Sequence, residues 1–284
     1  MSRPGETGRD YAPAVSFLEA AVLGVVQGLT EFLPISSTAH LRIVPALVGW
    51  KDPGTPFTAV VQLGTVAAVL LYFRKELIRI VVAWAQGLRS PERRRSLDSR
   101  MGWYLIVATI PIVVFGAIFS KSIETGARNL YLIGVVLIVF GLVLLLADRI
   151  GSKHRPLETV ETRDGIVVGF AQSLALVPGV SRSGATISAG LFMGLDRLAA
   201  ARFSFLLAIP AVLLSGLYEL RHATSAQTGT AQLLVATLLA FVVGYASIAF
   251  LLRFLSRHTL VPFVVYRIAL GGVVLGLVAT GVIG

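Results

Sequence analysis

Two clusters of polar residues interrupt otherwise apolar stretches of this 284-residue chain. The first reads Gln27-Gly-Leu-Thr-Glu-Phe-Leu-Pro-Ile-Ser-Ser-Thr-Ala-His40, and the second reads Pro178-Gly-Val-Ser-Arg-Ser-Gly-Ala-Thr186. Ionisable side chains are costly at membrane depth, so Glu31, His40 and Arg182 are candidates for function. The forked donors of Arg182 suit a phosphate group.

Hydroxyl side chains follow a helix breaker in both clusters. They are Ser36, Ser37 and Thr38 in the first cluster and Ser181, Ser183 and Thr186 in the second. We expect a helix to begin at each of these points, and the free N–H groups of a helix start favour an anion. Together with Arg182, they predict a pocket for phosphate or pyrophosphate. Glu31 and His40 add the acid, base or nucleophile that anion binding alone would not need.

Most of these residues also have a simpler structural explanation. Serine and threonine in membranes often bond back to their own helix, and small residues let helices pack closely. Glu31 could pair with an arginine, and a lone histidine near an interface, such as His40, is more often structural than catalytic. Arg182 stands between two serines after a Pro-Gly turn and is the hardest to explain in this way.

The composition predicts a membrane protein. Hydrophobic residues make up 55% of the chain and charged residues 14%, whereas soluble domains carry about 25% charged residues. There is no cysteine, which excludes disulfides and thiolate metal sites. The net charge of +10 is concentrated in loops, and no basic groove with interleaved aromatic residues points to nucleic acid. Residues Met1–Ala14 are polar and lack the pattern of a cleavable signal peptide.

Six apolar stretches are long enough to span a bilayer. They are Phe57–Phe73, Trp103–Phe119, Leu130–Ala147, Phe203–Leu220, Leu233–Leu252 and Val261–Ile283. Two further stretches, Ala14–Val48 and Gly165–Leu195, are broken by the polar clusters. Non-helical backbone at membrane depth requires surrounding protein or water, so we interpret both as re-entrant helix pairs. The expected fold is an all-α polytopic membrane protein forming one membrane domain over residues 1–284.

The order of these elements indicates an inverted-topology repeat. Shifting the sequence by 145 residues places Gly24, Gln27 and Ser36 on Gly169, Gln172 and Ser181. Repeat one would cover about 14–147 and repeat two about 165–284, and three spans per repeat invert one half relative to the other. The loop Arg74–Arg100 holds eight Lys/Arg and Asp148–Asp164 holds four, against two in Ser120–Asn129 and one in Arg221–Gln232. The positive-inside rule then predicts a multi-pass protein of the bacterial inner membrane with both termini outside.

Residues 24–40 and 176–188 closely resemble the two signatures of the undecaprenyl-pyrophosphate phosphatases of the bacitracin-resistance type. The resemblance runs from about Ser16 to the C-terminus. It implies hydrolysis of undecaprenyl pyrophosphate to undecaprenyl phosphate and phosphate at the outer, periplasmic face. That reaction recycles the lipid carrier for peptidoglycan synthesis and gives bacitracin resistance. The matching positions imply these working residues: Glu31, Ser36, Ser37, His40, Ser181, Arg182, Ser183 and Thr186.

Gln27 departs from the family's pattern, which commonly has two glutamates four residues apart in the first signature. Four residues make about one helical turn, so Gln27 and Glu31 would share a face. A single carboxylate weakens the case for a divalent cation, Mg²⁺ or Ca²⁺, held by two acids, and leaves Glu31 as the one expected protein carboxylate ligand. A glutamine still offers a carbonyl ligand or an amide donor.

We hypothesise that the lipid tail lies between helices while the pyrophosphate enters an outward-facing pocket. Arg182 would stabilise developing charge, and His40 or a hydroxyl, with Ser37 the leading candidate, would attack or activate water. Glu31 would orient that group or take its proton. Substrate binding falls to Gln27, Ser36, Thr38, Ser181, Ser183 and Thr186. The sequence leaves open whether a covalent phospho-enzyme forms.

A transporter or flippase of undecaprenyl phosphate is the alternative, because inverted repeats with broken helices are also a transporter architecture. A carrier would need Arg182 more than it needs the nucleophile or base offered by Glu31 and His40. A purely structural subunit would leave both polar clusters unexplained. We expect a polyprenyl pyrophosphate and membrane lipids as partners, and the sequence leaves a homodimer open.

Overall fold

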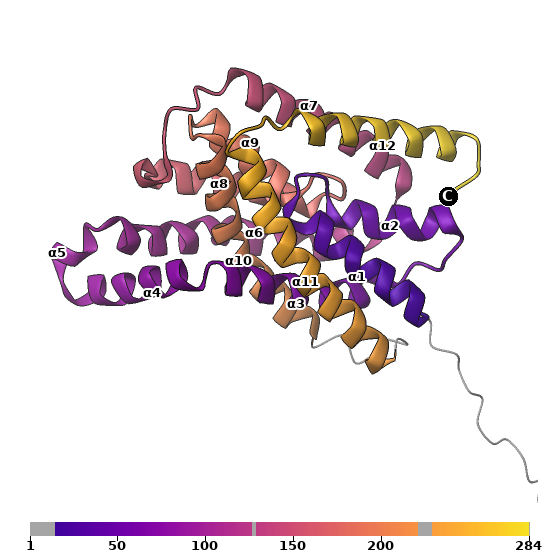
Figure 1. Ribbon diagram of the computed structural model, residues 1–284, viewed down its shortest axis with the longest axis horizontal. Helices are drawn as coiled ribbons and strands as arrows, with labels where there is room; N and C mark the ends of the chain where they lie inside the picture. Colours follow the sequence, from indigo (N-terminus) through magenta and orange to yellow (C-terminus); the bar gives the residue numbers. More distant parts are fainter. Residues whose placement is uncertain (1–14, 127–128, 221–228, 284) are drawn as a thin grey trace, which may run out of the picture.

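The long helices form one bundle in the computed structural model, which describes residues 15–126, 129–220 and 229–283 (Figure 1). Within these residues, six helices are long and apolar enough to cross a membrane. They are α3 (Gly54–Tyr72), α6 (Leu97–Gly126), α7 (Leu130–Ile150), α10 (Arg197–Leu220), α11 (Thr230–Leu255) and α12 (Val261–Ala279). Each coincides with one of the six predicted spans, so the prediction of an all-α polytopic membrane protein is confirmed.

Four shorter helices form two consecutive pairs, and each pair is broken within a polar cluster. The first pair is α1 (Phe17–Phe32) and α2 (Ser37–Val48), and the second is α8 (Thr162–Ser173) and α9 (Arg182–Phe192), with a 3₁₀ turn, η2, over Leu174–Leu176. At 11 to 16 residues each, these helices are about 17–24 Å long, which is shorter than a hydrocarbon core of about 30 Å. The non-helical segments within the two pairs, residues 33–36 and 177–181, are called the first and second tips below.

The short helices pack against long helices from the other half of the chain. Helix α1 lies along α11, and α8 lies along α6. Glycine permits both contacts, because a Cβ on Gly24 would overlap the carbonyl of Ala236 and one on Gly169 would lie 2.5 Å from the Cα of Ala108. Helices α3 and α10 also pack together, as do α7 and α12. The two tips are therefore held within a single bundle.

The segment Arg74–Arg100, which we interpreted as a loop, is largely helical instead. It forms α4 (Arg74–Arg89), α5 (Pro91–Arg94) and the first turn of α6, and it projects beyond the bundle in Figure 1. Ile80 is buried in the core, and the Trp84 ring packs edge-on against Trp103 of α6 with centroids 5.6 Å apart. Basic residues elsewhere in α4, such as Arg74, Arg79 and Arg89, lower the average hydropathy of the segment, and this hid a helix that forms by packing on α6.

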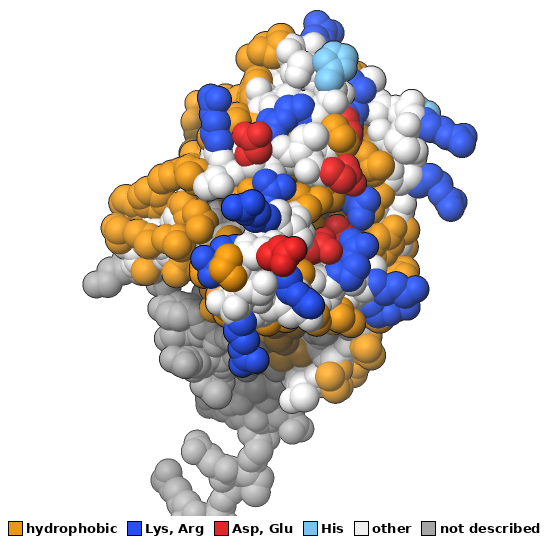
Figure 2. Space-filling model, turned by 90° about the vertical axis from the view of Figure 1, so that its left-hand side faces the viewer, with side chains coloured by type: hydrophobic (Ala, Val, Ile, Leu, Met, Phe, Trp, Pro, Cys, Tyr) orange, Lys and Arg blue, Asp and Glu red, His pale blue; other side chains and the backbone are white. Residues whose placement is uncertain are grey.

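The same end of the molecule carries the connection between α7 and α8, where a second 3₁₀ turn, η1, covers Leu157–Thr159. Arg155 donates to both carboxylate oxygens of Asp164 at 3.0 and 2.7 Å, and this pairing raises the pKa of the Arg155 guanidinium. Figure 2 shows lysine and arginine gathered on this face with a few acidic residues among them. The predictions for both termini fall on residues 1–14 and 284, outside the described residues. The loops Ser120–Asn129 and Arg221–Gln232 lie partly outside them.

Candidate functional site

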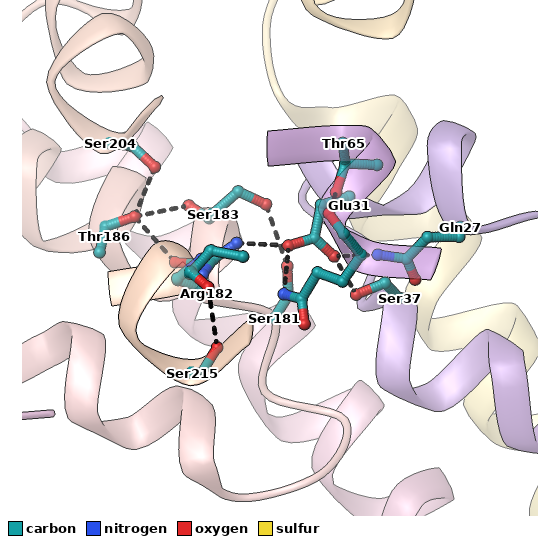
Figure 3. A network of polar contacts seen from close by, with 12 residues as sticks. Gln27, Glu31, Ser37, Thr65, Ser181, Arg182, Ser183, Thr186, Ser204 and Ser215 are labelled. Carbon is teal, nitrogen blue, oxygen red and sulfur yellow. Dashed lines mark hydrogen bonds and ion pairs between the residues drawn. The ribbon is translucent and has the colours of Figure 1, made fainter. Parts of the chain in front are cut away.

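The carboxylate of Glu31 lies at the centre of a buried polar network (Figure 3). One of its oxygens, Oε1, accepts hydrogen bonds from Arg182 and from Gln62 Nε2, the latter at 3.1 Å. The other, Oε2, accepts from Gln27 Nε2 at 2.9 Å and from the Ser37 hydroxyl at 2.7 Å. The structure therefore brings together Gln27, Glu31, Ser37 and Arg182, four of the predicted site residues, from α1, α2 and α9.

Ser37 and Arg182 enter this network because each is the first residue of a helix. The preceding residues, Ser36 and Ser181, are the N-caps, and their hydroxyls accept from the N–H groups of the third helical residues at 3.4 and 3.2 Å. Both caps have positive φ, 77° for Ser36 and 71° for Ser181, a conformation that costs free energy for residues other than glycine. Strained backbone at both tips thus aims the two following side chains at Glu31.

The conformation of Ser181 leads to a testable difference between two small substitutions. Ser181→Ala removes the cap hydroxyl and keeps the strained φ, whereas Ser181→Gly removes the hydroxyl and relieves the strain. We expect the alanine variant to be less stable than the glycine variant by about 1 kcal/mol. Thermal unfolding of both variants in the same detergent measures this, with the Ser36→Ala and Ser36→Gly pair as a parallel. Equal stabilities would contradict the conformational argument.

A buried arginine in α12 joins the two tips. Arg267 is fully buried, and its guanidinium donates to the carbonyl of Pro34 at 3.1 Å in the first tip. It also donates to the carbonyls of Gly179 and Val180 at 2.9 and 3.0 Å in the second tip. A fourth donation, from Nε, reaches the Leu137 carbonyl at 3.3 Å. Arg267 therefore fixes the two tips relative to each other and, through them, the distance between Ser37 and Arg182.

The hydroxyls of the second cluster are used mainly for structure. The Ser183 hydroxyl donates to the Leu33 carbonyl of the first tip at 3.0 Å. Thr186 is buried, and its hydroxyl bonds the Arg182 carbonyl at 2.8 Å and the Ser204 hydroxyl at 2.6 Å. In the first cluster, Thr38 is exposed and its hydroxyl lies 3.2 Å from that of Ser36. The expectation that these groups bind substrate stays a prediction.

His40 lies apart from the Glu31 network. Its Nδ1 is 2.7 Å from the Ser36 carbonyl, and its Nε2 is 2.7 Å from the Tyr266 hydroxyl. The ring is buried and stacks on that of Tyr266 with centroids 5.6 Å apart. Among the described residues, no hydrogen bond or ion pair joins His40 to Glu31, Ser37 or Arg182. Its predicted catalytic role therefore has no direct contact to support it.

Two residues of the site were not among the predicted ones. Gln62 of α3 donates the fourth hydrogen bond to the Glu31 carboxylate. Arg267 donates hydrogen bonds to backbone carbonyls of both tips. Each is a polar or charged side chain within an apolar span, which is a recognised signal of function. That signal marks both residues as unusual, but spacing along the chain does not show which groups they contact.

A small cavity opens beside Glu31 and Arg182 between α3 and α10. Its walls are mostly apolar, consisting of Phe32, Thr65, Val66, Val69, Ala208 and Val212. The Glu31 and Arg182 side chains are only 5% and 15% exposed. Electrostatic interactions are stronger in such a poorly hydrated place. The Ser37 hydroxyl donates to the Glu31 carboxylate, which can take its proton. The Arg182 guanidinium contacts the same carboxylate and can also bind an anion such as a phosphate.

The described residues contain no group of three His, Asp or Glu side chains that could enclose a metal ion. Glu31 is the only carboxylate in its network, and its oxygens already accept four hydrogen bonds. The Gln27 Oε1 atom, by contrast, is buried without a hydrogen-bond partner. Mg²⁺ commonly binds through one or two carboxylates and the phosphates of a substrate, so Glu31 with Gln27 Oε1 would fit that limited role once one of the four hydrogen bonds on Glu31 is displaced.

The fold and the site define a multi-pass helical membrane protein with a buried carboxylate, hydroxyl and arginine at the meeting point of two broken helix pairs. A family model described as bacitracin resistance protein BacA matches residues 20–273, and the chain belongs to this family. A relative from Nocardioides sp. (strain ATCC BAA-499 / JS614) is 55% identical over 271 residues, which cover 95% of this chain and 99% of the relative. One from Mycobacterium sp. (strain KMS) is 56% identical, with 95% and 99% covered. One from Thermobifida fusca (strain YX) is 52% identical, with 95% and 92% covered. All three are named undecaprenyl-diphosphatase.

Proposed function

We propose that this chain is a membrane phosphatase that hydrolyses undecaprenyl pyrophosphate to undecaprenyl phosphate and inorganic phosphate. The observation that carries the proposal is the 2.7 Å hydrogen bond from Ser37 to Glu31, on the carboxylate that Arg182 also binds. The name shared by the relatives, undecaprenyl-diphosphatase, agrees with this chemistry. The reaction returns the lipid carrier to peptidoglycan synthesis and accounts for the bacitracin resistance of the family's description.

In the reaction we propose, Ser37 attacks the terminal phosphorus while Glu31 takes the hydroxyl proton. The bond from that phosphorus to the bridging oxygen breaks, and undecaprenyl phosphate leaves with this oxygen and the proton from Glu31. Water then attacks the phosphoserine, Glu31 passes the proton of the water to the serine oxygen, and phosphate is released. Only one nitrogen of the Arg182 guanidinium is bound by Glu31, so its other N–H donors are available for phosphate oxygens as charge develops.

The covalent step predicts a labelled serine. Substrate labelled in its terminal phosphate, mixed with purified protein and quenched with acid, should leave label on the peptide that contains Ser37. Ser37→Ala should lose the label and reduce the rate of phosphate release by at least about 100-fold, since it removes the nucleophile. Ser247→Ala removes a buried hydroxyl of α11 that bonds only its own helix and serves as the matched control. Normal turnover by Ser37→Ala would overturn the covalent route and favour direct attack by water.

A carrier of undecaprenyl phosphate, the alternative function, would need the cation of Arg182 but no hydroxyl held on a carboxylate. Phosphate release by the purified wild type, beside His40→Ala and Arg182→Ala and with or without a chelator, separates the two functions. We expect hydrolysis by the wild type. Its absence under all metal conditions would contradict the phosphatase. Glu31 and Gln27 Oε1 would hold a divalent cation, which would neutralise charge on the phosphates and which the chelator would remove.

We further infer an inverted repeat in which α1–α2 and α8–α9 are re-entrant pairs. Three features support it: each helix of the two pairs is too short to span, both N-caps have the same strained backbone, and the first helix of each pair packs on the second span of the other repeat. In this arrangement the first pair enters from the outer face of the inner membrane, where the pyrophosphate would bind. Single cysteines placed in this naturally cysteine-free chain and labelled from either side test the orientation.

A further inference from the structure

A second, larger cavity lies at the end of the bundle near the start of α4. Its volume is about 820 Å³, within the range of about 300–1,000 Å³ for small-molecule sites. Three elements form its walls: the α3–α4 junction, the first turns of α10 and the last turns of α11. Its lining combines apolar and basic side chains, and the residues used below are Tyr72, Lys75, Glu76, Arg202, Phe250 and Arg253.

Basic side chains outnumber acidic ones in this lining. Glu76 is its only acidic residue, and Arg202 neutralises it through a 2.8 Å hydrogen-bonded ion pair. The side chains of Lys75 and Arg253 have no hydrogen bond or ion pair with any described residue. Two positive charges therefore remain uncompensated in a cavity that is otherwise largely apolar, which suits an anionic ligand.

The position of the cavity indicates a lipid as the source of that anion. It lies where α3 ends at Tyr72, α10 begins at Arg197 and α11 ends at Leu255, which is the boundary between apolar spans and charged connections. Phe250 is 53% exposed, and Tyr72 packs on Tyr245 with ring centroids 5.3 Å apart. Tyrosine is enriched at such membrane boundaries. Apolar walls on the membrane side, with the side chains of Lys75 and Arg253, unpaired among the described residues, on the water side, match a phospholipid whose phosphate lies outermost.

Three aromatic rings stand between this cavity and the Glu31 site. Phe73 lines the basic cavity, and Phe32 lines the small cavity beside Glu31. The ring of Phe205 packs between them, with centroids 6.3 Å from Phe73 and 5.3 Å from Phe32. All three side chains are buried. The basic cavity is therefore separate from the proposed catalytic site.

We infer that this cavity binds the headgroup phosphate of an anionic phospholipid through Lys75 and Arg253, with the lipid chains lying over Phe250. A basic residue near a membrane surface attracts anionic lipid by about 1 kcal/mol. The pairing of Arg202 with Glu76 holds the start of α4 beside α10 and so fixes this wall of the cavity.

The affinity of the purified protein in detergent for phosphatidylglycerol, measured by native mass spectrometry, tests this inference. Lys75→Gln and Arg253→Gln should each weaken binding about fivefold, and the double variant about 25-fold. Arg257→Gln removes an exposed arginine just beyond the end of α11 and outside the cavity, so it should leave binding unchanged. Phosphatidylcholine, which has no net charge, should bind equally to all variants, and inorganic phosphate should not compete.

Phosphate release from undecaprenyl pyrophosphate is measured on the same samples. We expect wild-type rates from every variant, since the cavity is separated from Glu31. Equal phosphatidylglycerol binding by the wild type and the double variant would overturn the lipid site, as would an equal loss in Arg257→Gln. Loss of hydrolysis in the double variant with unchanged thermal stability would instead place the cavity on the substrate path. Competition by inorganic phosphate would identify an anion site rather than a lipid site.

Discussion

Replacing Arg182 with alanine is expected to reduce kcat for phosphate release by about 1,000-fold or more, because a donor to developing charge in a buried site is lost. The guanidinium is buried against Glu31 and is the charged donor nearest to the Ser37 hydroxyl in the network. Arg182→Lys should recover only a small part of the rate, since an ammonium lacks the forked donors that bind two oxygens at once. Initial rates with purified variants in the same detergent measure both effects.

Loss of Arg182 also leaves the buried Glu31 carboxylate without its cation, so folding must be assessed separately from chemistry. Breaking a buried ion pair from one side typically costs about 3–5 kcal/mol of stability. The double variant Glu31→Gln with Arg182→Gln removes both charges and should be more stable than Arg182→Gln alone, while remaining inactive. An active double variant, or Arg182→Ala with more than about a tenth of the wild-type rate, would contradict the role given to Arg182.

Replacing Arg267 with methionine is expected to destabilise the protein by about 3 kcal/mol or more, because a hydrogen bond to a charged donor contributes about 1.5–3 kcal/mol. The substitution leaves the carbonyls of both tips without their shared donor. Since the tips then separate, kcat should fall in the remaining folded protein while KM changes little. Thermal unfolding and steady-state kinetics below the unfolding temperature give the two values.

Arg267→Lys provides the graded comparison for this position. An ammonium keeps the charge but cannot reach the same four carbonyls at once, so its stability should lie between those of the wild type and Arg267→Met. Arg149→Met, an exposed arginine at the end of α7, is the matched control and should behave as the wild type. Wild-type stability and kcat in Arg267→Met would show that the tips are held by other contacts.

The sequence predicted the spanning helices and the breaks well because both depend on local composition. Long apolar runs mark α3, α7 and α12, and Pro34 and Pro178 mark the breaks. Helix α4 was missed because its stability comes from Ile80 and Trp84 packing on α6, which average hydropathy does not report. The helix is amphipathic, and its arginines made the segment resemble a loop.

The central residues of the site were predictable because of their chemical types. A carboxylate, a hydroxyl and a guanidinium at broken helices identified Glu31, Ser37 and Arg182. The direction of each side chain could not be predicted, since it depends on partners far along the chain. Arg267, for example, donates to Pro34, 233 residues away in sequence, and His40 pairs with Tyr266, 226 residues away.

The placement of Arg267 in α12, far along the chain from the first tip, has a consequence for biosynthesis. All members of the Glu31 network have been synthesised once the ribosome passes Arg182, yet the arginine that fixes both tips is added 85 residues later. A nascent chain that ends before α12 contains both tips but not the side chain that joins them. Until Arg267 is added, the carbonyls of Pro34 and Gly179 lack the donor that they share in the folded protein. The site is therefore complete only after α12 has been synthesised, because its Arg267 joins the two tips.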